Sequence, residues 1–352
     1  MNKKRYAYID LAKALGMLAV IWGHIHTSGE SFVFVYAFDI PLFFFLSGMM
    51  FKNEKYDTLW KLVKNRAKTL LLPYVIFSIA TWLVWVGYNL VLHNDVNYFA
   101  PLLQTVIAQG SGGYLVHNVP LWFVTCLFVV EVLYYFICKL PDIWSVLICA
   151  ACAGLGYWML NNSLSFDFTK LPWNIESALS AILFYCLGNL FIKHFKIEAI
   201  PNWVQKNKWK SIFSIAVLTV ILAIGAIYNG HVSIGSNLLG KNIFVFYAVG
   251  LVGTFSTLFF SNLLELPKSN IADRLVGGVK WIGKNSFYFM AVHVPIKGFL
   301  IVVLAKLLHV STGAIASNFF ESIIIWIGTL ICSFCAVLLI NMFKKKFTKK
   351  NA

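Results

Sequence analysis

Two ionisable side chains on the first apolar segment have the types and the spacing to act on one ligand. His24 follows Lys13 by eleven residues, about three helical turns, so both side chains lie on one helix face about 16 Å apart along the axis. A lysine attracts anionic groups, and a neutral imidazole accepts a proton at neutral pH. The pair is therefore a candidate site for the two ends of one long ligand. In the structural alternative, Lys13 reaches the lipid headgroups and His24 bonds to a neighbouring helix.

The next apolar segment begins with a carboxylate and ends with small residues. Asp39 lies at the same end as His24, which permits a pair between histidine and carboxylate, although an interfacial aspartate without a role fits as well. Ser47 and Gly48 have small side chains, which allow another helix or a ligand to approach closely.

A cationic stretch precedes the third apolar segment. It contains Lys61, Lys64, Arg66 and Lys68. Such a stretch sets the topology of a membrane protein. It also suits phosphate binding, because arginine offers a fork of donors and several cations share the charge. We expect Lys64, Arg66 and Lys68 to bind phosphates together with Lys13.

Further polar residues fall inside later apolar segments, where charges are costly and are candidates for function until paired. They are Glu131, Glu176, His293, Lys297 and Glu321. The sequence does not identify their partners, although His293 and Lys297 are spaced to share one helix face.

The composition fixes the kind of protein that holds these residues. Of 352 residues, 59% are apolar and 12% are charged, which is far outside the range of soluble domains. The net charge of +15 is spread over short tracts between apolar runs, so it marks a membrane side rather than a nucleic-acid surface. The cysteines lie within apolar runs, and we expect no disulfide and no metal site.

The apolar runs divide into ten predicted transmembrane helices. A span needs about 20 residues, and the predicted ranges are 9–29, 33–51, 70–92, 117–138, 143–160, 174–194, 211–229, 243–263, 285–307 and 318–342.

The distribution of cations gives this all-α bundle its orientation. With these spans, 25 of the 29 Lys and Arg residues fall on one side, which the positive-inside rule assigns to the cytoplasm. Both termini are therefore predicted to be cytoplasmic. The outer loops hold only Lys170 and Lys241, and the longest of them, 93–116, is predicted to turn at the glycine-rich stretch 110–113.

Several segments together resemble membrane acyltransferase family 3, particularly the branch similar to fucose 4-O-acetylases. The resemblance covers nearly the whole chain, and its segments are Tyr8 to Lys13 with Trp22-Gly23-His24, Ile40 to Gly48, Arg66 to Tyr74, Pro120-Leu121-Trp122-Phe123, and Gly283 to Phe287 running on to His293.

The family transfers acyl groups, usually acetyl from acetyl-CoA, to sugar hydroxyls of cell-surface or exported glycans. By this resemblance His24 takes the place of the essential histidine, and Lys13 stands where many members carry arginine. Arg66 matches the first arginine of a paired motif, and Thr69 occupies the second position, where Lys68 is a candidate substitute.

The resemblance implies a single membrane acyltransferase domain over 1–352. The positive-inside pattern in a short chain fits a bacterial cytoplasmic membrane. His24 is the expected general base with Asp39 beside it, and the cationic residues are expected to bind acetyl-CoA. Trp122 and His293 are expected to contact the glycan acceptor at the outer face. Direct transfer and an acyl-histidine intermediate both stay open.

Two other classes of function compete with this interpretation. A transporter or exporter of a polar or lipid-linked glycan would use the intramembrane charges as a path. Such a protein is expected to have helices interrupted in corresponding halves, and the sequence lacks that pattern. A scaffolding protein would have no need for the spacing of Lys13, His24 and Arg66.

Overall fold

The computed structural model describes residues 6–110, 113–161, 171–266 and 269–350. Within these ranges the regular structure is helical, apart from one isolated β-bridge between Ser233 and Leu238. Among the cations used to predict the topology, Lys3, Lys4, Arg5, Lys170 and Lys268 lie outside the described ranges, as do the predicted turn residues Ser111 and Gly112.

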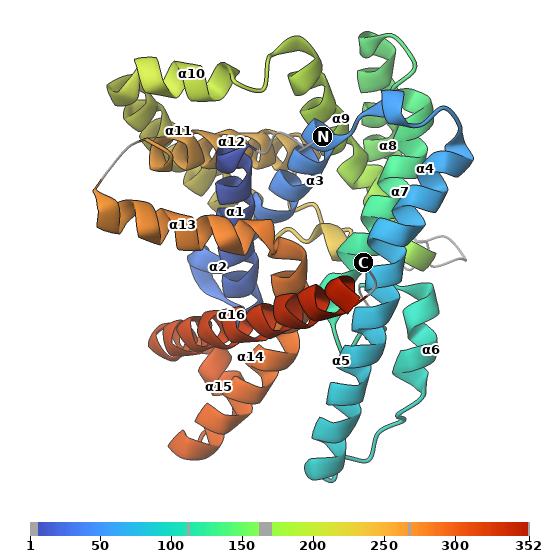
Figure 1. The fold of residues 1–352 in the computed structure, drawn as a ribbon, viewed down its shortest axis with the longest axis vertical. Helices are drawn as coiled ribbons and strands as arrows, with labels where there is room; N and C mark the ends of the chain where they lie inside the picture. The colour runs from blue at the N-terminus through green and yellow to red at the C-terminus, as the bar shows by residue number, and fades with distance from the viewer. Residues whose placement is uncertain (1–5, 111–112, 162–170, 267–268, 351–352) are drawn as a thin grey trace.

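Ten helices in the described ranges are long and apolar enough to cross a membrane, which confirms the predicted spans. Figure 1 shows them as a bundle with crossing axes. In chain order they are α1 (Ala7–Ile25), α2 (Gly29–Tyr36) with α3 (Asp39–Met50), α4 (Leu59–Arg66) with η2 (Ala67–Leu71) and α5 (Leu72–Val91), η3 (Val119–Leu121) with α7 (Trp122–Ile137), α8 (Asp142–Asn161), η5 (Pro172–Asn174) with α9 (Ile175–His194), α11 (Lys208–Asn229), α12 (Ile243–Leu264), α14 (Ser286–Leu308) and α16 (Phe319–Lys350).

Within the described ranges, four shorter α-helices lie between the spans and were not predicted. They are α6 (Ala100–Ile107), α10 (Ala199–Lys206), α13 (Asn270–Lys284) and α15 (Thr312–Ser317). Each is shorter than a span, and a search for long apolar runs does not detect such helices. The third span also begins earlier than predicted, at Leu59, because its cationic first turns continue the same helix.

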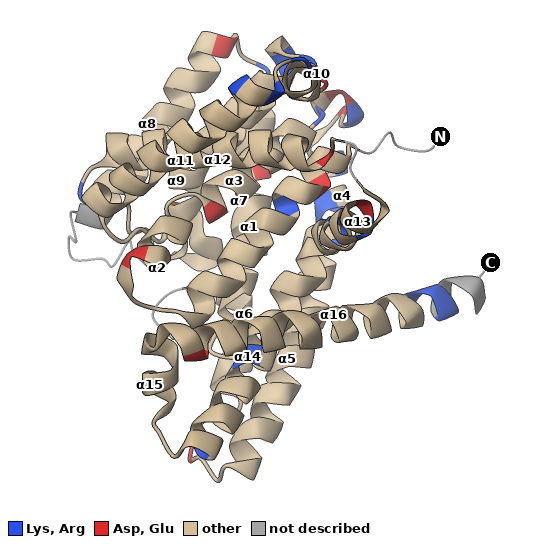
Figure 2. Ribbon diagram, turned by 90° about the vertical axis from the view of Figure 1, so that its left-hand side faces the viewer, with Lys and Arg blue, Asp and Glu red and all other residues tan. Residues whose placement is uncertain are grey.

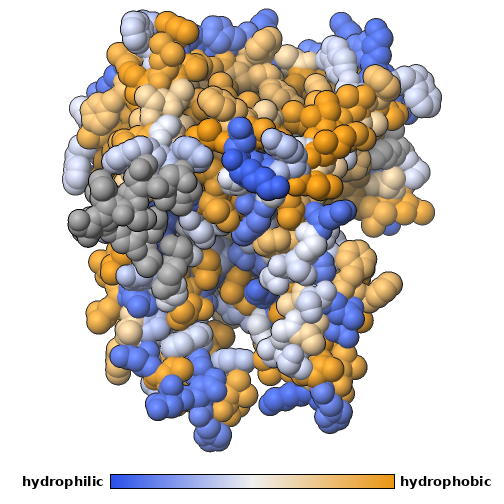
Figure 3. All heavy atoms as spheres, turned by 180° about the vertical axis from the view of Figure 1, so that it is seen from behind, coloured by the Kyte–Doolittle hydropathy of each residue, from blue (hydrophilic) through white to orange (hydrophobic). Residues whose placement is uncertain are grey.

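Charge and apolar surface divide the molecule as a bilayer requires. The Lys and Arg of α4, α10, α13 and the end of α16 gather toward one side (Figure 2). Large apolar side chains are exposed along α5, α11 and α16, among them Leu83, Ile224 and Ile331. In Figure 3 hydrophobic residues cover much of the upper half of the face, and hydrophilic residues lie along its upper and lower edges and in its middle. The chain is a multi-pass membrane protein.

Helices α3 and α9 cross at two glycines. A Cβ atom at Gly48 would overlap the backbone carbonyl of Tyr185, and one at Gly188 would overlap that of Phe45. The predicted close approach at Ser47-Gly48 is therefore confirmed. Asn189 secures the crossing, because its Nδ2 donates to the carbonyl oxygens of Gly48 (3.1 Å) and Phe51 (3.2 Å).

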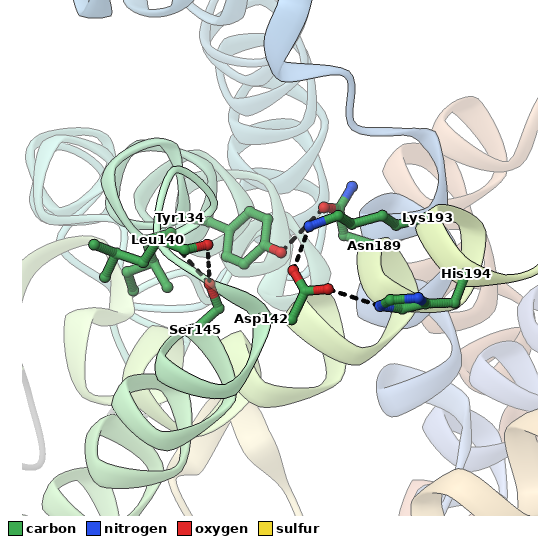
Figure 4. Close-up of polar contacts among 8 residues, drawn as sticks. Tyr134, Leu140, Asp142, Ser145, Asn189, Lys193 and His194 are labelled. Carbon is green, nitrogen blue, oxygen red and sulfur yellow. Dashed lines mark hydrogen bonds and ion pairs between the residues drawn. The ribbon is translucent and has the colours of Figure 1, made fainter.

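Polar contacts also hold α7, α8 and α9 together at one end (Figure 4). The hydroxyl of Tyr134 on α7 donates to Oδ1 of Asn189 at 3.1 Å. Asp142, at the start of α8, pairs with Lys193 and accepts from Nε2 of His194 at 2.7 Å at the end of α9. These contacts join the three helices, and α3 packs against α9.

The glycine crossing predicts a position-specific effect on stability. Gly188→Ala inserts a methyl group against the Phe45 carbonyl, and overpacking of this kind costs about 1–3 kcal/mol. We expect the Tm of the purified protein in detergent to fall by several degrees. Gly154→Ala on α8 is the control, because nothing lies within 4 Å of its added Cβ. An equal Tm for the two variants would contradict the close crossing.

Candidate functional site

A cavity of about 200 Å³ runs alongside α1. Four residues of α1 line it, Lys13, Met17, Val20 and His24, at steps of four, three and four residues that keep them on one helix face. The prediction that Lys13 and His24 share a face is therefore confirmed, and the face borders an internal space.

The other walls of the cavity are mainly apolar. Two serines, Ser47 on α3 and Ser286 at the start of α14, are the hydroxyl side chains among the lining residues. The remaining lining residues are Ile40, Phe43, Leu70, Pro120, Trp122, Phe123, Val124, Leu127, Phe287 and Met290. The cavity is therefore a largely apolar space with one lysine and one histidine among its lining residues.

One wall residue belongs to an irregular helical turn. Leu70 lies in η2, a π-helical stretch that joins α4 and α5. A π-helix widens the turn and is often found at functional sites. Nothing in the sequence indicates this turn, because the residues Ala67–Leu71 are ordinary helix formers.

A second histidine lies directly beside His24. The ring centroids of His24 and His293 are 5.3 Å apart. Nδ1 of His293 is 3.0 Å from the carbonyl oxygen of Phe289, and because a carbonyl only accepts, Nδ1 carries the hydrogen of this bond. In a neutral ring Nε2 then carries the unshared lone pair. This atom has no hydrogen-bond partner in the described part of the chain. His293 is fully buried behind the cavity wall.

Lys297 contacts the backbone of the candidate base. Its Nζ donates to the carbonyl oxygen of His24 at 2.5 Å. Helix α1 ends at Ile25, so this carbonyl belongs to the last turn, where intrahelical donors are missing. A cation at that position caps the helix and complements its dipole. Sequence reasoning could not find this contact, because the acceptor is a main-chain atom.

Helix α14 holds His293 and Lys297 across a proline. Pro295 lies inside α14 and has no N–H to donate to the carbonyl four residues earlier, that of Ala291. Nδ2 of Asn118 donates to this carbonyl at 2.7 Å. The loop before α7 therefore satisfies the break in α14. In the same loop, burial lowers the pKa of His117 to about 4, which keeps its imidazole neutral.

Asp39 is buried at the start of α3 but is not paired with His24. Its Oδ1 accepts from its neighbour, the backbone N–H of Ile40, at 2.6 Å. Among the contacts of the described residues, none joins Asp39 to His24. A catalytic role for Asp39 stays a prediction.

The four predicted phosphate-binding residues lie in three different surroundings. Arg66 forms an ion pair with the buried carboxylate of Glu131, which also accepts from the hydroxyl of Tyr185 at 3.2 Å. Lys64 and Lys68 are exposed on either side of Arg66. Lys13 is the cation of this set that lines the cavity.

The remaining intramembrane carboxylates do not border the cavity. Oε1 of Glu176 accepts from Nε2 of Gln109 at 2.8 Å. Glu321 lies at the exposed start of α16, where its backbone N–H donates to Oδ1 of Asn318 at 3.3 Å. Trp122 does line the cavity, as the prediction of a substrate contact requires, whereas His293 reaches it only through His24.

A known protein family matches the chain over nearly its whole length. The family model described as an acyltransferase domain, that of acyltransferase family 3, matches residues 6–342. No curated protein and no solved structure matched the chain. Because the family match covers nearly the whole chain, the protein belongs to acyltransferase family 3 and is a membrane acyltransferase.

Proposed function

We propose that the protein transfers an acetyl group from cytoplasmic acetyl-CoA to a hydroxyl group of a cell-surface or exported glycan. The observation that carries the proposal is the cavity along α1, which has a lysine toward one end and a histidine toward the other. The donor would lie within it, and the acceptor would meet the acetyl group at His24.

The donor matches the cavity in charge and in length. The phosphates of CoA are anionic, so they would lie at the Lys13 end with the exposed Lys64 and Lys68 nearby on the third span. The pantetheine arm is narrow and extended, and the rise from Lys13 to His24 is about 16 Å. Because Arg66 already pairs with Glu131, we propose that it supports the phosphate site by holding the third span in place.

Orientation supports the same assignment. The side of the molecule that gathers Lys and Arg (Figure 2) would face the cytoplasm, where acetyl-CoA is found. Helix α1 then carries Lys13 at the inner end and His24 at the outer end. This arrangement, in a bacterial cytoplasmic membrane, lets an inner donor and an outer acceptor meet inside the bundle.

His24 supplies the proton transfer that the reaction needs. In direct transfer, its neutral imidazole removes the proton of the sugar hydroxyl as the oxygen attacks the thioester carbonyl. The bond between carbon and sulfur then breaks, and the leaving thiolate takes the proton from the imidazolium. Asp39 and Trp122 are the candidates for orienting the sugar, and His293 acts through its contact with His24.

Lys297 is a positioning residue in this proposal. Its ammonium holds the carbonyl of His24 and so fixes the last turn of α1, on which the orientation of the imidazole depends. The hydrogen bond of Asn118 to the carbonyl left free by Pro295 supports the part of α14 that carries the lysine.

The first test removes the base. His24→Gln should lower acetyl transfer from labelled acetyl-CoA to surface glycans by about 10²- to 10⁴-fold, the usual contribution of a general base. His26→Gln is the matched control, because His26 is buried two residues away against Ser322 and does not line the cavity. Full activity in the His24 variant, or an equal loss in both, would exclude His24 as the base.

The second test separates positioning from donor binding. Lys297→Met removes the charged hydrogen bond to His24, worth about 1.5–3 kcal/mol, so kcat should fall by roughly 10- to 100-fold while the KM for acetyl-CoA stays the same. Lys297→Arg keeps a donor and should recover part of kcat. A raised KM with unchanged kcat would place Lys297 in donor binding instead.

A further inference from the structure

Trp122 packs against two glycines from different loops. A Cβ atom at Gly110 would overlap the indole at Cγ and Cδ1, and a Cβ atom at Gly235 would overlap it at Nε1 and Cε2. Gly110 follows α6, and Gly235 lies between α11 and α12. Both loops therefore pack directly on the ring, at positions where a larger residue than glycine would overlap it.

Asn174 ties these two loops to each other. Its Oδ1 accepts from the backbone N–H of Gly110 at 2.9 Å, and its Nδ2 donates to the carbonyl oxygen of Gly235 at 2.9 Å. Asn174 is fully buried and has a φ of 53°, a conformation that asparagine tolerates better than most residues. One amide group thus joins both loops. Gly110, Trp122, Asn174 and Gly235 together form what we call the Trp122 clamp.

The clamp lines the cavity at the His24 end. Consecutive spans alternate in direction, so α7 begins at the end of the bundle where α1 finishes. Trp122 is the first residue of α7 and lines the cavity, as does Ile40 near the start of α3. A donor that enters at Lys13 therefore meets His24 and Trp122 last.

The rigid wall restricts what the thioester can carry. With the thioester carbonyl at His24, any further acyl carbons must extend toward Trp122. Because the indole packs directly against the backbone at Gly110 and Gly235, a longer chain cannot push it aside. We propose that the Trp122 clamp limits the donor to short acyl groups such as acetyl and excludes medium-length chains. This inference rests on the proposed transfer from acyl-CoA.

The test compares donors of different length in the full-length protein. The ratio of kcat/KM for octanoyl-CoA to that for acetyl-CoA is measured with the host glycan as acceptor. Trp122→Ala should raise this ratio at least roughly tenfold, since even one methylene group changes discrimination by about 10- to 200-fold. Asn174→Gly keeps the positive φ but releases the loops, so it should raise the ratio in the same direction.

Leu127→Ala is the matched control, because it enlarges the same cavity further along α7 toward the Lys13 end. It should leave the ratio unchanged. The inference is wrong if Trp122→Ala and Asn174→Gly leave the ratio unchanged, or if Leu127→Ala raises it equally. Trp122→Leu gives the same comparison if the alanine variant does not fold. If the unmodified protein transfers acetyl and the variants do not change the ratio, only the inference about the clamp is wrong. If the unmodified protein transfers no acetyl group, the proposed function is wrong.

Discussion

The hydrogen bond from Lys297 to the carbonyl of His24 is the contact on which the arrangement of the site depends. Helix α1 supplies one wall of the cavity, but the His24 carbonyl in its last turn has no donor within the helix. A buried ammonium on α14 supplies one, and α14 can offer it there because Asn118 satisfies the backbone break at Pro295. The position of one imidazole is thereby tied to three separate segments of the chain.

Close helix crossings fix the rest of the cavity. At the other end of α1, a Cβ atom at Gly283 would overlap the carbonyl of Asp10, so α13 runs directly against α1 just before α14 begins. The crossing of α3 and α9 at Gly48 and Gly188 holds the opposite wall. Because these contacts are between backbones, they leave little freedom for the cavity to widen, which suits a site that must align two substrates.

Periodic features of the chain were predictable from its sequence. The ten spans follow from apolar runs, and the common face of Lys13 and His24 follows from helical geometry. The close approach at Gly48 follows from residue size. Each of these depends on residues near one another in the sequence, where the spacing of an α-helix is sufficient information.

Contacts between distant segments were not predictable. Arg66 was expected to bind phosphates, yet it forms an ion pair with the buried Glu131. A single sequence does not reveal such a pair. The acceptor of Lys297 is a carbonyl, which every residue has. The π-helical turn at Leu70 and the bridge that Asn174 makes between two loops depend on tertiary packing.

In the proposed reaction the cavity along α1 holds the acyl donor. A cryo-electron microscopy structure of the protein in lipid nanodiscs with a non-hydrolysable acetyl-CoA analogue tests it most directly. We expect the pantetheine arm between α1, α3 and α14, with the phosphates at the Lys13 end and the thioester position beside His24. An analogue bound elsewhere, with this cavity unchanged, would contradict the account.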